Sequence, residues 1–275
     1  VGMSGNFRQM KRRILNIAVF RKETLYQKMR ALIIYLVISA VFIGCTPILS
    51  IDASTQSVYH FSDTDKNISL LDISETFGTY DGSFVLYDNN LDSWKIYDLE
   101  EATKRIPPES TYKIYDALLG LESGIITPEH SSMTWNGDAF PFPSWEADQD
   151  LNSAMQNSVN WYFQAIDSQL GINRVQEFLN KIEYGNQTTS SNLDLYWSDF
   201  SLKISPLEQV TLLKKFNTNE FHLNSQNVFS VKNAIKIAST PNGNFYGKTG
   251  TGRVNGQDIN GWFIGYVETS DNSYY

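Results

Sequence analysis

The sequence predicts an α+β domain that is preceded by one transmembrane helix. Apolar and aromatic β-type runs occur near both ends of residues 71–275, and segments with helical periodicity lie between them. A stretch of 21 uncharged residues lies upstream. Strands at both ends with helices between them imply an antiparallel sheet that joins sequence-distant strands, with the helices packed on it.

The uncharged stretch runs from Ala31 to Ile51 and is long enough to cross a bilayer as a helix. Eight of the 22 basic residues, but one of the 30 acidic residues, precede Ala31. Because segments rich in Lys and Arg stay on the cytoplasmic side, we expect residues 1–30 to be a cytoplasmic basic juxtamembrane segment. We therefore expect a single-pass protein of the cell membrane, with the residues after the helix outside the cell.

A cleaved signal peptide is the alternative interpretation of this stretch. Met29 is a candidate internal start, and the Phe-Ile-Gly sequence before Cys45 loosely resembles a lipoprotein cleavage site. An apolar patch among the basic residues, at 14–19, is typical of a membrane-surface segment and favours the transmembrane helix. The sequence opens on Val1 and stops at Tyr275 inside an apparent strand, so we expect a fragment of a longer protein.

The region after the membrane helix begins with polar sequence. Residues 52–70 are rich in Ser, Thr, Asp and Asn, which is typical of a linker. Two β-type runs follow at 83–87 and 94–97, and the Asp-Asn-Asn sequence between them predicts a hairpin. We expect the folded domain to comprise residues 71–275, truncated at its C-terminus.

The middle of the chain is expected to be mostly helical. Helical spacing extends over 150–170 and recurs at 175–182, and a capping-box pattern at 205–208 starts another helix. The β-pattern then returns, with runs at 245–251 and 262–268 on either side of an Asn-Gly turn sequence. This arrangement predicts a second hairpin.

Charge and metal-ligand content exclude two classes of function. The net charge of −8 becomes −15 when residues 1–30 are left out. The acidic domain lacks the basic stripe that phosphate binding needs, so we expect no nucleic-acid partner. One cysteine excludes an internal disulfide, and the histidines (His60, His130 and His222) are far apart, so no metal site is expected.

Ser110 is the candidate nucleophile. Pro107 and Pro108 end the preceding segment and suit the first turn of a helix, and a serine is favourable at a helix start. Lys113 follows at i+3, so both side chains share one helix face. A neutral amine there can take the hydroxyl proton, and a helix N-terminus favours negative charge nearby. Taken alone, the pair is more often a capping serine followed by a solvated lysine, because such short motifs are common.

Three further motifs occur in order along the chain. They are Ser158-Val159-Asn160, Tyr184-Gly185-Asn186 and Lys248-Thr249-Gly250. Together with the Ser-x-x-Lys motif they resemble the serine penicillin-recognising superfamily, and most closely its class D β-lactamase branch. The sensor domains of BlaR/MecR-type β-lactam signal transducers are built on the same branch. Matches at Trp197, 201–205 and 261–266 extend the resemblance over about residues 75–275.

The resemblance implies a β-lactamase/penicillin-binding transpeptidase-like fold, with a final strand and a C-terminal helix after Tyr275. A β-lactam is a strained amide beside a carboxylate, so opening it needs a nucleophile, a base, a proton donor, an oxyanion hole and a carboxylate anchor. The resemblance implies that Ser110 is the nucleophile, Lys113 its base and Ser158 the proton relay to the ring nitrogen. The lysine pKa must be lowered by desolvation for this role.

The resemblance also implies that the Lys-Thr-Gly motif binds the substrate. Lys248, Thr249, Gly250 and Thr251 would anchor its carboxylate, and the backbone N–H groups of Ser110 and Thr251 would form the oxyanion hole. The Tyr-Gly-Asn motif at 184–186 is expected to be structural at the rim of the site or simply a helix C-terminal turn.

The state of Lys113 after acylation distinguishes a sensor from a hydrolase, and Asn160 and Trp197 are expected to set it. In class D relatives the neutral lysine captures carbon dioxide as a carbamate, which a tryptophan at the position of Trp197 hydrogen-bonds. A carboxylated Lys113 is thus the one cofactor-like group that the resemblance allows. Asn160 and the Thr251-Gly252 pair match the transducers better than the hydrolases. The Asn160 amide can hydrogen-bond the bare amine and so disfavour the carbamate needed for deacylation.

We therefore expect a membrane-anchored β-lactam receptor that is acylated at Ser110, deacylates slowly and signals induction of resistance. Its expected partners are β-lactam antibiotics, the membrane and an upstream cytoplasmic zinc-protease region, which the transducer family carries. One alternative is a class D β-lactamase anchored by its signal or by lipid on Cys45, with slow turnover. Another is a non-catalytic penicillin-binding scaffold. The lifetime of the acyl adduct distinguishes these functions.

Overall fold

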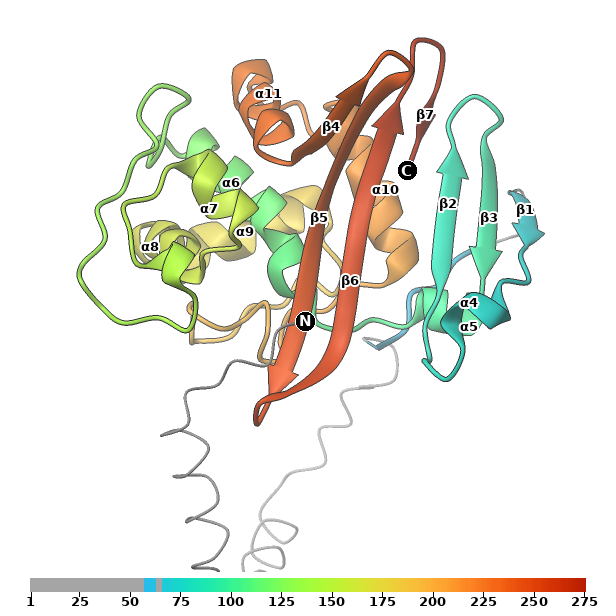
Figure 1. Cartoon of the computed structure of the whole chain (residues 1–275), viewed down its shortest axis with the longest axis horizontal. Coiled ribbons are helices and arrows are strands. Elements are labelled where there is room, and N and C mark those ends of the chain that lie inside the picture. The colour runs from blue at the N-terminus through green and yellow to red at the C-terminus, as the bar shows by residue number, and fades with distance from the viewer. Residues whose placement is uncertain (1–56, 63–65) are drawn as a thin grey trace, which may run out of the picture. The chain divides into compact units, whose positions relative to one another are not determined.

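The computed structural model describes residues 57–62 and 66–275 of the chain (Figure 1). The basic segment 1–30 and the transmembrane segment 31–51 expected from the sequence lie outside these residues. Among the helices in the described ranges, none has the length and apolar character needed to cross a membrane.

The described residues form seven strands and ten helices, two of which are 3₁₀ helices. The strands are β1 (Asn67–Leu70), β2 (Phe84–Asp88), β3 (Ser93–Tyr97), β4 (Lys236–Thr240), β5 (Gly243–Val254), β6 (Gln257–Glu268) and β7 (Ser273–Tyr274). The helices are α4 (Ser74–Phe77), α5 (Leu99–Thr103), η1 (Glu109–Tyr112), α6 (Lys113–Glu122), η2 (Pro143–Trp145), α7 (Leu151–Gln156), α8 (Asn160–Leu170), α9 (Ile172–Ile182), α10 (Pro206–Asn217) and α11 (Ser225–Ala234).

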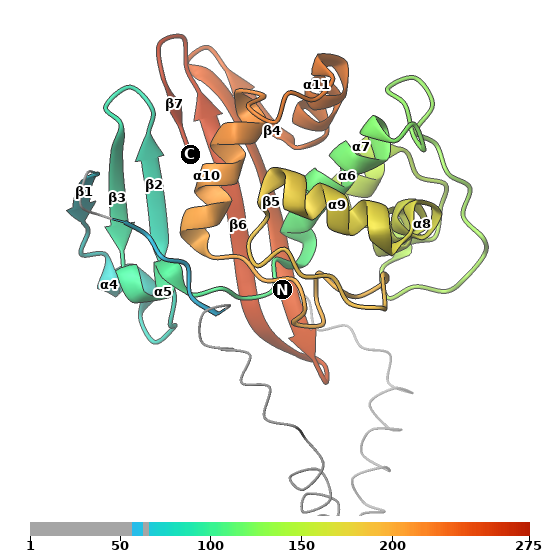
Figure 2. The same cartoon turned by 180° about the vertical axis from the view of Figure 1, so that it is seen from behind.

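The strands join into one sheet with the order β1-β3-β2-β7-β6-β5-β4. Strands from both ends of the described chain therefore lie in the same sheet, and α6 to α9 come between them in sequence. Figure 1 shows these helices gathered beside β5, and Figure 2 shows α10 against the face of the sheet at β6. The predicted α+β class is confirmed, and the sheet is antiparallel as predicted except where β1 pairs in parallel with β3.

Both predicted hairpins are present. Strand β2 pairs antiparallel with β3, and β5 pairs antiparallel with β6 along nearly its whole length. The turn between β5 and β6 consists of Asn255 and Gly256, whose φ angles are 51° and 80°. A two-residue turn with φ positive at both positions matches the twist of the flanking strands, and Asn-Gly is the sequence that adopts it most readily.

The linker expected at 52–70 ends earlier than its composition indicates. Residues Asn67–Leu70 form β1 and pair in parallel with β3, and Val58 forms a bridge with Lys104. Strand β1 lies at the edge of the sheet, and Ile68 is its half-buried apolar residue. One inward-facing side chain is too weak a signal to distinguish an edge strand from a polar linker.

The helix expected over 150–170 is interrupted. Helix α7 ends at Gln156 and α8 begins at Asn160, so the Ser-Val-Asn motif lies at a break between two helices and not within one. Ser158 has a φ of 54°, a left-handed conformation that ends the first helix. The helices expected at 175–182 and after Ser205 are confirmed, and the Ser205/Glu208 capping box is formed.

Helix α6 is the centre of the helical region. All of its residues from Lys113 to Leu121 are buried, and it packs against α7, α8 and α11. Gly120 allows α8 to approach closely, since a Cβ there would lie 3.0 Å from Ile166 Cγ2. A helix that is covered on every side withdraws the lysine at its first position from water.

A buried ion pair fixes the segment that leads into α6. Arg105 and Glu208 pair through two nitrogens of the guanidinium, with a distance of 2.9 Å from Arg105 Nε to Glu208 Oε2. Their side chains are 15% and 8% exposed. Glu208 also accepts hydrogen bonds from the backbone N–H and hydroxyl of Ser205. One carboxylate therefore holds both the start of α10 and the approach to η1.

We expect Glu208→Ala to lower the free energy of unfolding by about 2–3 kcal/mol, because it leaves the Arg105 side chain, which is 15% exposed, without its partner. This is at or below the low end of the cost of breaking a fully buried pair. The matched control is Glu101→Ala, which removes the exposed pair between Glu101 and Lys104 and should cost less than about 1 kcal/mol. Urea denaturation followed by tryptophan fluorescence measures both. Equal losses in the two variants would contradict the assigned role of the buried pair.

Candidate active site

The turn that carries Ser110 is held from both sides. The indole Nε1 of Trp262 on β6 donates to the Pro107 carbonyl at 2.8 Å, and the Glu109 N–H donates to the Trp197 carbonyl at 3.0 Å. Ser110 lies in η1, one turn before α6, and not at the first turn of the α-helix itself. Its side chain is partly exposed, whereas Glu109 before it and Thr111 after it are buried. The fold therefore presents one hydroxyl from an otherwise buried turn.

Lys113, the predicted base, lies in contact with Ser110, the predicted nucleophile. Its Nζ donates to Ser110 Oγ at 3.1 Å and to Asn160 Oδ1 at 2.7 Å. The rings of Phe163 and Trp197 lie 5.6 and 5.5 Å from Nζ, measured to their centroids. Burial, together with the positive charge of Lys248, lowers the pKa of Lys113 to about 7. A substantial fraction of the amine is thus neutral near physiological pH and can accept a proton.

Ser158 and Lys248 form a second serine–lysine pair. Lys248 Nζ donates to Ser158 Oγ and, at 3.1 Å, to the Thr249 carbonyl. Burial lowers the pKa of Lys248 to about 8. The left-handed backbone of Ser158 at the α7–α8 break turns the motif toward β5. Two hydroxyls, each beside a lysine amine, therefore lie in one site.

Strand β5 approaches the nucleophile turn at Gly250. A Cβ on Gly250 would lie 3.0 Å from the Pro108 carbonyl oxygen and 3.2 Å from the Ser110 backbone nitrogen. Any larger residue would push the nucleophile turn away from β5, so glycine favours this close approach. Thr249 and Thr251, which alternate with Gly250, have exposed side chains, so their hydroxyls are available to a ligand.

The Tyr-Gly-Asn motif supports the site and does not line it. Asn186 donates from Nδ2 to the Ser201 carbonyl at 2.7 Å and accepts from the Lys203 N–H at 2.9 Å. Tyr184 is fully buried and its ring contacts that of Tyr112. A Cβ on Gly185 would collide with the Lys203 carbonyl oxygen. The motif thus fixes the segment that follows Trp197.

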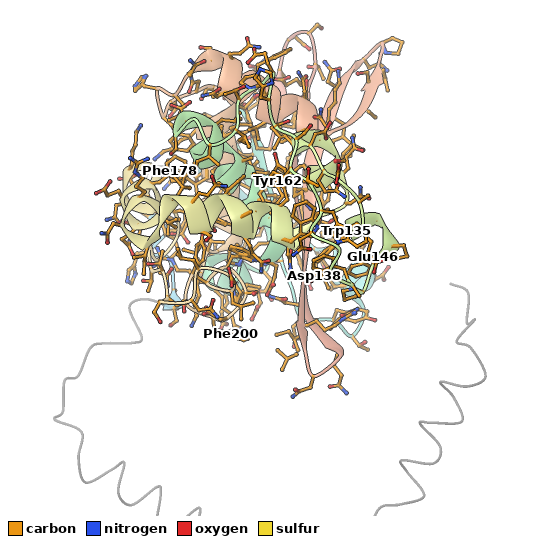
Figure 3. All side chains as sticks on the ribbon, turned by 90° about the vertical axis from the view of Figure 1, so that its left-hand side faces the viewer. Trp135, Asp138, Glu146, Tyr162, Phe178 and Phe200 are labelled. Carbon is orange, nitrogen blue, oxygen red and sulfur yellow. The ribbon has the colours of Figure 1, made fainter. Side chains whose placement is uncertain are left out.

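The segment between α6 and α7 forms a rim beside Ser158. Trp135, Asp138 and Glu146, labelled in Figure 3, lie on this segment at one end of the helical region. The Trp145 indole donates to the Asn157 carbonyl at 2.9 Å. Since Asn157 precedes Ser158, this bond ties the rim to the α7–α8 break.

Two buried acids beneath Lys113 were missed by the sequence interpretation. Asp116 and Asp167 lie on α6 and α8 and are fully buried. Burial, and repulsion from Asp167, raise the pKa of Asp116 far above its usual value, and burial raises that of Asp167. An acid at i+3 from Lys113, within an apolar helix, is the sequence signal that could have pointed to Asp116. In protonated form the pair does not hold Lys113 in its charged state.

Within the described part of the chain, no group of three or more His, Cys, Asp or Glu side chains is arranged to hold a metal ion. The hydroxyls and amines brought together in this site support attack by a serine, proton transfer to amines and electrostatic stabilisation at β5.

The chain belongs to the penicillin binding protein transpeptidase domain family, which matches residues 78–275. Within that family it is 43% identical to the regulatory protein BlaR1 of Bacillus licheniformis over 99% of its own length and 45% of the relative. It is 37% identical to the methicillin resistance mecR1 protein of Staphylococcus aureus over 97% of its length and 45% of that protein. The chain thus spans just under half the length of these close homologues.

Solved structures with a similar fold include a BlaR penicillin-receptor domain and a class D β-lactamase. The C-terminal domain of the Bacillus licheniformis BlaR penicillin-receptor matches with a TM-score of 0.74 and 46% identity, over 76% of this chain and 86% of that domain. Class D β-lactamase BAT-2 matches with a TM-score of 0.71 and 35% identity, over 74% and 85% of the two chains. The expected transpeptidase/β-lactamase-like fold and the expected resemblance to BlaR/MecR proteins are confirmed.

Proposed function

We propose that this chain is part of a membrane-anchored extracytoplasmic β-lactam receptor, which β-lactams acylate at Ser110 and which deacylates slowly enough to signal induction of resistance. The observation that carries the proposal is the pair of hydrogen bonds from Lys113 Nζ to Ser110 Oγ and Asn160 Oδ1. Similarity to BlaR1, mecR1 and the BlaR penicillin-receptor domain supports it.

Acylation begins when Ser110 Oγ attacks the β-lactam carbonyl carbon. The Oγ–C bond forms as the Oγ proton moves to neutral Lys113 Nζ, and the carbonyl oxygen becomes an oxyanion. The backbone N–H groups of Ser110 and Thr251 stabilise this charge. When the C–N bond breaks, Ser158 passes a proton from the Lys248 ammonium to the ring nitrogen. The product is an acyl-serine, a charged Lys113 and a neutral Lys248.

The carboxylate of the antibiotic would act first on Lys248. The carboxylate of a β-lactam would lie beside Lys248, Thr249 and Thr251, and this negative charge favours the protonated form of Lys248. The charge on Lys248 in turn lowers the pKa of Lys113. The negative carboxylate of the ligand would offset part of this effect on Lys113, so the lowered pKa of Lys113 rests mainly on burial.

Slow deacylation follows from the contacts of Lys113. Hydrolysis of the acyl-serine needs a base that activates water, and a carbamate on Nζ is the base that the class D resemblance implies. The Asn160 Oδ1, 2.7 Å from Nζ, is an acceptor that would face a carbamate oxygen with like partial charge. The bare amine is therefore favoured over the carbamate, and the acyl-serine persists.

A class D β-lactamase is the second candidate function. The buried ring of Trp197 lies over Lys113, where the resemblance implies a partner for a carboxylated lysine. Similarity to class D β-lactamase BAT-2 and to the probable β-lactamase YbxI of Bacillus subtilis, at 35% identity over 76% of this chain and 77% of that protein, supports this candidate.

The proposed receptor is organised around the membrane. Residues 1–30 would be cytoplasmic and 31–51 the transmembrane helix. The sensor domain outside the cell would include β1 and so begin no later than Asn67. The greater length of the BlaR1 and mecR1 proteins supports a longer protein, with an upstream cytoplasmic zinc-protease region as the partner that receives the signal.

Intact-mass measurement after mixing with benzylpenicillin tests the proposal. We expect an adduct of one antibiotic on Ser110 that persists for many minutes, because water activation is impaired at Lys113. The Ser110→Ala variant should form no adduct. Rapid return to the unmodified mass would establish the hydrolase in place of the receptor, and the absence of any adduct on the natural sequence would indicate a non-catalytic scaffold.

The role of Asn160 is tested with Asn160→Val. Removing the amide acceptor frees Nζ for carbon dioxide, so with bicarbonate present the adduct lifetime should fall at least about tenfold, since a general base contributes ~10²–10⁴ to such a step. Asn157→Ala, which changes an exposed asparagine at the same helix break, should keep the lifetime of the natural sequence. An unchanged lifetime in Asn160→Val removes this residue from the explanation.

The acylation rate should depend on pH through Lys113. The base acts in its neutral form, and its pKa is about 7, so the second-order rate constant should fall about tenfold per pH unit well below the midpoint. Stopped-flow mixing with a chromogenic cephalosporin between pH 5 and 8.5 measures this dependence. A rate that is constant across this range would show that Lys113 is not the base.

A further inference from the structure

Glu109 is a buried acid directly before the nucleophile. Its φ is 52°, a left-handed conformation that side chains with a Cβ rarely adopt. Its N–H is bonded to the Trp197 carbonyl, so the backbone conformation is fixed from outside the turn. The residue is 5% exposed. An acid held in a strained conformation inside the molecule indicates a role beyond solubility.

The Glu109 side chain lies between the nucleophile turn and the β5–β6 hairpin. A Cβ on Gly250 would be 3.1 Å from Glu109 Cβ, and a Cβ on Gly252 would be 2.6 Å from Glu109 Oε1 and would collide with Asn260 Oδ1. The two glycines of β5 thus leave the space that the carboxyl group occupies. Asn260 Oδ1 is buried and has no hydrogen-bond donor.

The charge that faces Glu109 belongs to Lys113. Burial raises the pKa of Glu109 to about 7, while Lys113 and the Asn260 amide act to lower it. Lys248 on β5 acts on Lys113. Arg253 of the same hairpin is exposed and pairs with Asp258. The ionisation of Glu109 is therefore linked most directly to that of Lys113. The negative charge of Glu109 raises the pKa of Lys113.

We propose that Glu109 is a proton-dependent positioning residue for acylation: its side chain joins the Ser110 turn to the β5–β6 hairpin, and when it is ionised it holds Lys113 in its charged, inactive form. The protonated carboxyl supplies a donor beside the unpartnered Asn260 Oδ1 and adds no charge behind the oxyanion hole. The ionised carboxyl stabilises the Lys113 ammonium and places negative charge beside the N–H groups that must bind an oxyanion. This inference rests on the proposed acylation at Ser110.

Glu109→Gln tests the inference, because glutamine keeps the shape and hydrogen bonding of the protonated acid at every pH. The pH midpoint of the acylation rate should move about 0.5–1 unit lower, at or below the low end of the 1–3 units expected for a close charge. At pH 7, where Glu109 is partly ionised in the natural sequence, this corresponds to an acylation rate about 1.5- to twofold higher. An unchanged midpoint, whether the rate is equal or uniformly reduced, would overturn the inference.

Glu109→Gly separates the two parts of the role. It relieves the left-handed backbone and removes the carboxyl, so the midpoint should move as in the glutamine variant, while the maximal acylation rate falls because the turn loses its contact with β5. A maximal rate equal to that of the natural sequence would overturn the positioning role. The matched control is Glu183→Gln. Glu183 has a φ of 57° but is exposed and pairs with Lys215, so an equal shift in this variant would also overturn the inference.

Thermal unfolding gives a readout that does not depend on acylation. A carboxyl group whose pKa is raised on folding contributes stability that is lost as pH rises from its unfolded value toward its folded value. The midpoint temperature of the natural sequence should therefore fall relative to Glu109→Gln between pH 5 and pH 8. A constant difference would overturn the inference even if the protein were not acylated at all, and the expected difference would support the ionisation of Glu109 independently of the proposed function.

Discussion

Burial of one lysine amine is the constraint on which the site depends. A solvated Lys113 would be charged and could not act as a base. Helix α6 is covered on every side, and two aromatic rings lie over Nζ. Hydrogen bonds to Ser110 and Asn160 satisfy the polar amine that burial has removed from water. The α6–α8 packing, the segment that carries Trp197 and the lysine of β5 all contribute to the lowered pKa.

Much of this arrangement could be predicted because its signals are local. The capping box at Ser205 and the Asn-Gly turn after β5 each act within a few residues, and both elements are present. The site motifs are also short and ordered. In the structure Lys113 is hydrogen-bonded to Ser110 and Asn160, and Lys248 is hydrogen-bonded to Ser158. The resemblance to a known family implies both arrangements.

The remaining features could not be predicted because they depend on distant parts of the chain. The break at Ser158 is a left-handed residue in a segment with helical periodicity, and the need to face β5 is absent from the local sequence. Strand β1 has one half-buried apolar residue, so pairing with β3 decides its structure. Glu109 looks like an ordinary first-turn acid. Its burial follows from Gly250 and Gly252, which are more than 140 positions away along the chain.

Acylation and deacylation make unequal demands on this site. The proposed acylation needs a neutral amine beside Ser110, and the burial of α6 favours one. It also needs a preorganised oxyanion hole, which we infer from the packing of η1 against β5. Deacylation needs a further base close to the acyl group. The Lys113 amine makes hydrogen bonds to Ser110 and Asn160 and lies beneath the rings of Phe163 and Trp197. A carbamate must displace one of these contacts, and the Asn160 bond is the shorter of the two. We therefore infer that, in the proposed receptor, the side chain at position 160 decides whether the antibiotic is released or retained.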